Sequence, residues 1–251
     1  SVIAALSSAS KLIAEHGGFE ADATDPILIG QIQVLDLPDM EVAKAALVER
    51  KQDIINLANS FHPNMVARGG GARDIELFVH PLPSSGKPML VVHLLVDTRD
   101  AMGANLTNGM CEGVAPLIES ITGGKVFLRI VSNLSDRSLA RAQCRIPAEA
   151  LGGADYSGEQ VRDGIIVATD FAHVDPYRAA THNKGIMNGI DAVVLATGND
   201  FRAVEAGIHA YTSRNGSYSS LTHASVENGI FKFWIEIPLA LGTVGGLTSL
   251  H

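Results

Sequence analysis

A long apolar run followed at once by a helical pattern is the feature that most constrains this chain. Residues 89–96 are almost continuously apolar, which is typical of a buried strand. From Asp100, expected to cap the helix, apolar side chains recur every four residues, as on one helix face: Met102, Leu106, Met110, Val114 and Ile118. Gly123 and Gly124 then follow, and a glycine in the left-handed backbone conformation commonly ends a helix. A glycine at such a helix start, here Gly103, lets backbone N–H groups meet a phosphate, although most such junctions are only tight turns.

Composition excludes several classes of function. The chain has 251 residues, 46% of them hydrophobic, which is enough for one large or two modest domains. Its net charge of −8, without a Lys/Arg run, argues against nucleic-acid or anionic-membrane partners. The two cysteines and nine histidines show no metal-ligand spacing, so we expect no metal. No apolar run approaches the roughly 18 residues of a membrane helix, and there is no signal-peptide pattern. We therefore expect a soluble cytoplasmic protein.

The middle of the chain alternates strands and helices in a recognisable order. Apolar alternation predicts strands at 31–34, 75–79, 89–96 and 126–130. A helix is expected from Pro38-Asp39 through Leu57, and another from Asp100 to Gly124. The order β-α-β-β-α-β is that of a ferredoxin-like domain, which we place at residues 27–132.

The flanking segments have a different character. We expect a helix at 2–15, a polar link at 20–26 and, after Asn133, helices and irregular loops. A helix capped at Ser157, a helix at about 202–214 and strand-like stretches at 218–222 and 231–237 follow. The expected fold class is α+β: a larger helix-rich domain (1–26 and 133–251) with the small domain inserted. Because the chain starts directly in a helical pattern, we expect a fragment of a longer protein.

Four features have the residue types that chemistry needs, and each has a simpler alternative. Lys184, within Thr-His-Asn-Lys, can stabilise an oxyanion if desolvated; the alternative is an exposed loop lysine. Asp200 fits equally well as a helix cap, which spacing alone favours. Arg178 can grip a carboxylate or pair with Asp175. The triple glycine 69–71 lacks the spacing of a phosphate loop and is better explained as a flexible turn. The residues alone indicate only a two-domain protein with an anion site.

Four motifs in order resemble hydroxymethylglutaryl-CoA (HMG-CoA) reductase of the bacterial second class: Asp-Ala-Met-Gly-Ala-Asn (100–105), Ala-Thr-His-Asn-Lys-Gly-Ile-Met-Asn-Gly (180–189), Ala-Thr-Gly-Asn-Asp (196–200) and Gly-Thr-Val-Gly-Gly (242–246). The resemblance covers essentially the whole chain. It implies a ferredoxin-like dinucleotide-binding domain within a substrate domain. It also implies an obligate homodimer with active sites at the interface, often assembled into a hexamer. The implied reaction converts HMG-CoA into mevalonate and CoA with two reduced nicotinamides, or runs in reverse in mevalonate catabolism.

The resemblance also assigns residues. Lys184 is implied to stabilise the oxyanion that forms when hydride reaches the thioester, with Asp200 beside it tuning its charge. The residues implied to bind or support the substrate are Ser1, Arg178, Asn188 and Asn133. The dinucleotide signature corresponds to Asp100, Met102, Gly103 and Asn105, with the diphosphate near the helix start.

This sequence departs from the family pattern in three places. The family's catalytic glutamate should lie two residues before Ser1, and its catalytic histidine on a flap beyond His251, so we expect this chain alone to be inactive. Where NAD-preferring members have an acidic residue, this chain has His62. An acid there would repel a ribose 2′-phosphate; His62, with Arg68 nearby, removes that repulsion and slightly favours NADPH over NADH.

Two other classes of function compete with the reductase. One is a non-catalytic module that binds a nucleotide or acyl-CoA. The other is a ferredoxin-like regulatory or RNA-binding domain. The negative net charge argues against RNA binding. The predicted strand 126–130 also has only one aromatic residue, Phe127, whereas a surface that stacks on bases needs several.

Overall fold

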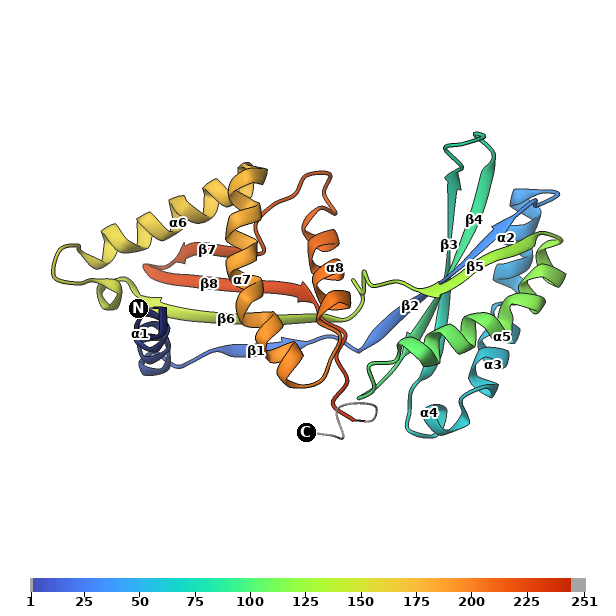
Figure 1. Cartoon of the computed structure of the whole chain (residues 1–251), viewed down its shortest axis with the longest axis horizontal. Helices are drawn as coiled ribbons and strands as arrows, with labels where there is room; N and C mark the ends of the chain where they lie inside the picture. Colours follow the sequence, from blue (N-terminus) through green and yellow to red (C-terminus); the bar gives the residue numbers. More distant parts are fainter. Residues whose placement is uncertain (1, 245–251) are drawn as a thin grey trace. The chain divides into compact units, whose positions relative to one another are not determined.

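The computed structural model describes residues 2–244 and confirms the α+β class (Figure 1). The chain divides into two compact units, described separately below. The large unit holds the described residues up to Thr24, Leu139–Ala196 and Asp200–Leu239. The small unit holds Asp25–Ser138, Thr197–Asn199 and the described residues from Ala240 on. Thr197–Asn199 and the residues from Ala240 on lie outside the range 27–132 that was expected for the inserted domain. The division into an inserted domain and a larger domain stays a proposal.

The small unit is one antiparallel sheet with helices against one face (Figure 1). Its strands, in sheet order, are β3 (Gly71–Pro81), β4 (Pro88–Asp97), β2 (Ile27–Leu35) and β5 (Lys125–Val131). Its helices are α2 (Met40–Glu49), α3 (Lys51–Ser60), α4 (Pro63–Ala67) and α5 (Ala104–Thr122). The first and third strands of the unit, β2 and β4, lie side by side between β3 and β5. This arrangement confirms the predicted β-α-β-β-α-β order.

The core of the small unit lies between this sheet and α2, α3 and α5. Ile32, Val92 and Leu94 from the sheet are fully buried against Met110 and Ile118 of α5. The predicted apolar stripe of α5 is therefore confirmed from Leu106 onward, because Leu106 packs partly buried against the same core as buried Met110, Val114 and Ile118. Its first member, Met102, was placed wrongly: it precedes the helix and is 39% exposed.

The predicted helix from Pro38 to Leu57 is two helices. Asp39 caps α2 by accepting the backbone N–H of Val42, as the sequence suggested. The helix ends at Arg50, whose backbone leaves the helical region with φ −98° and ψ 17°. Buried Leu47 and Ile54 keep helical spacing across the break. Because the apolar pattern continues, periodicity did not reveal the interruption.

The start of α5 differs from the prediction. Asp100 does not cap the helix, which begins at Ala104 after Gly103. Gly103 has φ +82°, a left-handed conformation that favours glycine, and no side chain caps the helix. The backbone carbonyl of Asp100 instead accepts the N–H groups of Thr243 and Val244 at 2.8 and 3.3 Å. The helix ends as expected at Gly123, with φ +66°.

The large unit also contains a four-stranded antiparallel sheet. Its order is β1 (Glu20–Ala23), β6 (Leu139–Pro147), β8 (Ile230–Pro238) and β7 (Thr222–Glu227). The strand β1 lies in the segment predicted to be a polar link, and β6 in the segment predicted to hold helices and loops. The strand β7 begins at Thr222, later than the predicted stretch 218–222. All four residues of β1 are exposed, and Glu20 pairs with Arg145 of β6, so β1 lacks an apolar signature. In β6, Cys144 and Ile146 alternate with Arg141, Gln143 and Arg145, a strand pattern that the prediction overlooked.

The large unit's helices are α1 (Val2–Glu15), α6 (Gly158–Val174), α7 (Pro176–Ala196), α8 (Phe201–Thr212) and a short 3-10 turn, η1 (Ala148–Leu151). Ser157 and Gln160 form a reciprocal capping box at the start of α6, which confirms the predicted cap. A small core of Cys144, Ile146 and Phe231 joins the sheet to α1 and α6. None of the helices within residues 2–244 is long and apolar enough to cross a membrane.

Candidate functional site

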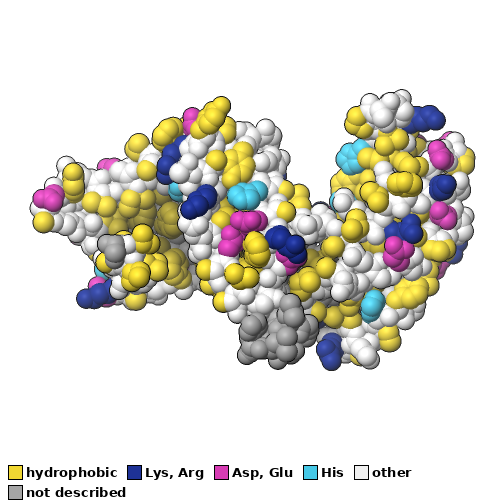
Figure 2. All heavy atoms as spheres, in the orientation of Figure 1, with side chains coloured by type: hydrophobic (Ala, Val, Ile, Leu, Met, Phe, Trp, Pro, Cys, Tyr) yellow, Lys and Arg dark blue, Asp and Glu magenta, His cyan; other side chains and the backbone are white. Residues whose placement is uncertain are grey.

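Three of the residues predicted to carry chemistry, Arg178, Lys184 and Asn188, lie on α7. Lys184 and Asn188 are four residues apart, so they project from the same side of the helix, and both are exposed. Tyr177 and Leu195, on the same side, are 88% and 62% exposed. Figure 2 shows exposed hydrophobic side chains in the region of α6 and α7. Lys184 is therefore exposed, but on a helix rather than in a loop.

The opposite side of α7 is anchored by polar residues. Asn183 is fully buried; its amide donates to the Ser219 carbonyl at 2.8 Å and accepts the Leu221 N–H at 2.9 Å. His182 bonds the Thr222 hydroxyl at 2.6 Å. Burial, with Arg178 nearby, lowers the pKa of His182, which favours the neutral ring. The sequence motif alone does not reveal this structural role of His182 and Asn183, because their partners lie about 40 residues away.

Arg178 and Asp175 do interact, but not as the predicted alternative had it. Asp175 accepts the backbone N–H of Arg178 at 2.7 Å, and thereby satisfies the first turn of α7. No guanidinium–carboxylate pair joins them within the described chain. The Arg178 guanidinium therefore stays available to a carboxylate ligand.

Asp200 is the cap of α8, which confirms the reading that spacing favoured. Its carboxylate accepts the N–H groups of Arg202 and Ala203 and pairs with the Arg202 side chain at 3.3 Å. Burial alone would raise the pKa of Asp200, but these hydrogen bonds outweigh it and the pKa is lowered. No ion pair links Asp200 to Lys184 among residues 2–244. Asn133 is exposed just after β5, and Ser1 lies outside the described residues.

The residues of three motifs meet within the small unit. The side-chain amide of Asn199 donates to the Gly242 carbonyl at 3.1 Å and accepts its N–H at 2.8 Å. The backbone N–H groups of Thr243 and Val244, which follow Gly242, donate to the Asp100 carbonyl. A Cβ on Gly242 would lie 2.7 Å from the backbone nitrogen of Met102. The 100–103 turn is thus held by segments more than 90 residues away in sequence.

The start of α5 fits a phosphate-bearing ligand. A Cβ on Gly103 would lie 2.3 Å from Thr98 Cγ2, so only glycine fits this turn. Without a side-chain cap, the first N–H groups of α5 remain available to an anion. His62 lies against α5, with Nε2 3.1 Å from the point where a Cβ on Gly109 would be. Asn105 is one helical turn closer to the start of α5 than Gly109, so His62 lies beside the helix about one turn beyond Asn105.

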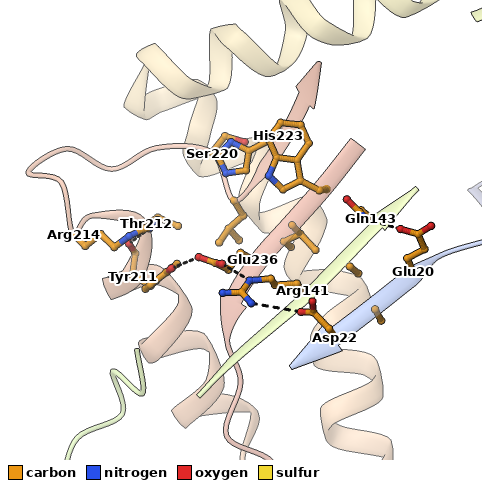
Figure 3. A pocket seen from close by; sticks show the side chains of 15 residues that line it. Glu20, Asp22, Arg141, Gln143, Tyr211, Thr212, Arg214, Ser220, His223 and Glu236 are labelled. Atoms are coloured by element: carbon orange, nitrogen blue, oxygen red, sulfur yellow. Dashed lines mark hydrogen bonds and ion pairs between the residues drawn. The ribbon is translucent and has the colours of Figure 1, made fainter. Parts of the chain in front are cut away.

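A separate pocket of about 440 Å³ lies in the large unit (Figure 3). There Arg141 of β6 pairs with Asp22 of β1 and with Glu236 of β8. The Tyr211 hydroxyl also donates to Glu236 at 2.6 Å, and these two bonds lower the pKa of that carboxyl. None of the predicted site residues lines this pocket. Among residues 2–244, no three His, Cys, Asp or Glu side chains are grouped as metal ligands.

Comparison with known proteins identifies the family. All of residues 1–251 match the family described as hydroxymethylglutaryl-coenzyme A reductase. The chain belongs to that family. Its members are NAD(P)-dependent oxidoreductases, and the resemblance drawn from the four motifs is confirmed.

Two curated relatives match this chain over its whole length. The 3-hydroxy-3-methylglutaryl-coenzyme A reductase of Archaeoglobus fulgidus is 50% identical, and the probable reductase of Borreliella burgdorferi is 33% identical. The chain spans 56% of the length of each relative.

Solved structures of reductases also match this chain. The 3-hydroxy-3-methylglutaryl-coenzyme A reductase of Streptococcus pneumoniae is 39% identical, with a TM-score of 0.94 over 100% of this chain and 67% of that chain. A structure of the class II reductase from the same organism, bound to NADPH in open conformations, is 40% identical with the same TM-score, over 100% of this chain and 60% of that one.

Proposed function

We propose that this sequence belongs to an HMG-CoA reductase that converts HMG-CoA to mevalonate and CoA with two reduced nicotinamides, or catalyses the reverse oxidation. The observation that carries the proposal is the turn at 100–103. There the residues of three family motifs support an uncapped helix start in which only glycine fits.

The small unit would hold the dinucleotide. Gly103 and the N–H groups after it would bind the diphosphate, with Asp100, Met102 and Asn105 around it. The bound nicotinamide supplies hydride. His62 would lie near the adenosine ribose, where a neutral or cationic ring tolerates a 2′-phosphate that a carboxylate would repel. Binding of NADPH by the pneumococcal relative supports this choice, and we favour NADPH over NADH.

The large unit would bind and polarise the substrate. Lys184 donates to the oxygen of the thioester, and later of the aldehyde, as negative charge develops on it. Asp200 would lie beside Lys184 and keep its ammonium charged when water is excluded. Arg178, Asn188 and Ser1 would bind the hydroxymethylglutaryl group, with Asn133 supporting the hydrogen bonds. The active assembly would be a homodimer, or a hexamer built from dimers, and a cytoplasmic location stays a prediction.

The assay follows absorbance at 340 nm with HMG-CoA, comparing NADH with NADPH, in the parent protein extended to the length of its relatives. Two cofactors oxidised per thioester consumed, faster with NADPH, is the expected result. No oxidation of either cofactor, with HMG-CoA still bound, would leave the second candidate, a non-catalytic nucleotide- or acyl-CoA-binding module. The exposed Lys184 without an ion-pair partner in residues 2–244 is the observation that keeps that candidate open.

A further inference from the structure

The triple glycine 69–71, expected to be a flexible turn, is closely packed within the small unit. A Cβ on Gly70 would lie 2.6 Å from Met65 Sδ and 2.8 Å from the backbone carbonyl oxygen of Asp97. Gly69 has φ +84°, a left-handed conformation that favours glycine. The loop therefore lies in contact with the end of β4 at Asp97 and leaves no room for a side chain at residue 70.

Two arginines converge on this glycine loop. Arg99 donates to the Gly69 carbonyl through Nε at 2.9 Å and through Nη2 at 2.6 Å, and Arg73 donates to the same carbonyl. Both guanidinium groups also pair with the Asp97 carboxylate, Arg99 at 3.0 Å and Arg73 at 3.2 Å. The Asp97 side chain is 4% exposed, whereas the two arginine side chains are 41% and 46% exposed. A buried carboxylate and a backbone carbonyl thus anchor two partly exposed cations.

The same contacts continue into the turn before α5. Arg99 has φ +51°, a left-handed conformation that residues other than glycine rarely adopt, and its backbone N–H donates to Asp97 Oδ1 at 3.1 Å. The next contacts come from Thr98, which lies between these two residues. Its carbonyl accepts the Ala101 N–H at 3.1 Å, and its side chain is the one that a Cβ on Gly103 would meet at 2.3 Å. The bonds that hold residue 99 therefore also hold the residue against which Gly103 packs.

We propose that Arg99 is a positioning residue for the dinucleotide: by bonding both the Gly69 carbonyl and the Asp97 carboxylate, its guanidinium fixes the 98–103 turn in the conformation that presents the first N–H groups of α5 to the diphosphate. This role rests on the proposed reductase function. Arg99 does not need to touch the cofactor. The proposal also explains the unusual backbone of Arg99, because the side-chain bonds hold the residue in a conformation that it would otherwise avoid.

The positioning role of Arg99 differs measurably from the role proposed for His62. The diphosphate is common to NADH and NADPH, so loss of a residue that holds the diphosphate turn should weaken the binding of both cofactors by the same factor. Loss of a residue that contacts the 2′-phosphate would weaken the binding of NADPH alone, because NADH lacks that group. Arg99 should therefore change cofactor affinity without changing the choice between the two cofactors.

The first test needs no cofactor and follows amide hydrogen exchange in the extended parent protein. Arg99→Asn removes the guanidinium, and asparagine tolerates the left-handed conformation. Exchange over residues 97–103 should become roughly tenfold faster, as expected from the loss of hydrogen bonds to a charged group. Arg129→Ala is the matched control, because Arg129 is a partly exposed arginine of the small unit that pairs with Glu112 of α5. The control should leave exchange over 97–103 unchanged, and unchanged exchange in Arg99→Asn would overturn the proposal.

The second test measures cofactor dissociation constants and steady-state turnover in the same proteins. Arg99→Asn should raise the dissociation constants of NADPH and NADH by the same factor, roughly tenfold, and should raise the cofactor KM while kcat and the KM for HMG-CoA stay unchanged. Weakening of NADPH alone, or unchanged affinity for both cofactors, would overturn the positioning role. A wild-type protein that binds neither cofactor, with faster exchange in Arg99→Asn, would instead contradict the proposed function and leave the fixing of the turn by Arg99 standing.

Discussion

The turn before α5 and the exposed side of α7 are both predicted to be functional, yet they differ in how they are built. The turn is held from several sides: Gly103 fits against Thr98, Asp100 bonds Thr243, and Asn199 bonds Gly242. On α7, Lys184 and Asn188 are exposed, and Lys184 has no ion-pair partner among residues 2–244. The turn, the proposed nucleotide half, is therefore held in place by described residues. The exposed side of α7, the proposed chemical half, is anchored through Asn183, but Lys184 and Asn188 themselves face solvent.

The largest expected effect concerns the chemical half. Lys184→Ala in the extended parent protein should lower turnover about 10²–10³-fold, as loss of an oxyanion donor does. The stability of the 251-residue chain should change by no more than about 0.5 kcal/mol, because the side chain is exposed. Steady-state kinetics and urea unfolding measure the two quantities. A near-normal turnover would remove Lys184 from the mechanism.

Asp200→Ala should also impair turnover. If Lys184 and Asp200 act together, the double variant should lose far less turnover than the product of the two single losses.

The next largest effect is expected for Asn183, which anchors α7, and it concerns the free energy of unfolding. Asn183→Ala leaves the Ser219 carbonyl and the Leu221 N–H without a buried partner, which costs about 2–3 kcal/mol of unfolding free energy. Asn188→Ala, at an exposed position of the same helix, is the matched control and should stay within about 0.5 kcal/mol. Equal losses in the two variants would show that Asn183 does not anchor the helix.

The preorganised turn can be broken by one methyl group. Gly103→Ala places a Cβ against Thr98 at a left-handed φ, so it should destabilise the chain by roughly 2 kcal/mol and weaken NADPH binding. Gly185→Ala is the contrasting variant: a Cβ there meets nothing within 4 Å, and helix propensity favours alanine by about 1 kcal/mol. NADPH titration and thermal unfolding compare them. Unimpaired binding by the Gly103 variant would argue against the turn as the phosphate site.

The choice between NADPH and NADH tests the proposed position of His62 beside the adenosine ribose. His62→Asp should shift the ratio of the NADPH and NADH dissociation constants about tenfold towards NADH, equivalent to roughly 1.4 kcal/mol of like-charge repulsion. The shift should shrink at high salt, because the group is near the surface. An unchanged ratio would place the ribose elsewhere.

The smallest effect separates the two roles of Asp200. As a helix cap, Asp200→Ala should cost about 1 kcal/mol at pH 7. Because hydrogen bonds lower the pKa of Asp200 in the folded state, its contribution is complete above the ordinary aspartate value of about 3.9 and is lost as pH falls below it. The difference between wild type and variant should therefore shrink between pH 5 and pH 2. A constant difference would mean that the charge of Asp200 does not stabilise α8.

Sequence patterns predicted the small unit better than the large one. Alternating apolar strands and the stripe Met110, Val114 and Ile118 bury one continuous core, so periodicity sufficed there. The strand β1 escaped prediction because all its residues are exposed and its acids pair with arginines of β6. In β6, charged side chains alternate with Cys144 and Ile146, which enter the small core, and this two-residue period was overlooked. The turn at 100–103 depends on Asn199 and Thr243, contacts that local pattern does not contain. Nor does spacing distinguish buried Asn183 from exposed Lys184, its neighbour.

The measurement that tests the central claim most directly combines binding and turnover in the 251-residue chain. NADPH is titrated by its fluorescence, and HMG-CoA is then added while absorbance at 340 nm is followed. We expect saturable NADPH binding that Gly103→Ala weakens, and no oxidation, because Lys184 is exposed, has no ion-pair partner among residues 2–244, and polarises a carbonyl only weakly in water. Absence of NADPH binding in a folded chain, or steady oxidation on addition of HMG-CoA, would contradict the division between a preorganised nucleotide half and a chemical half whose Lys184 is exposed.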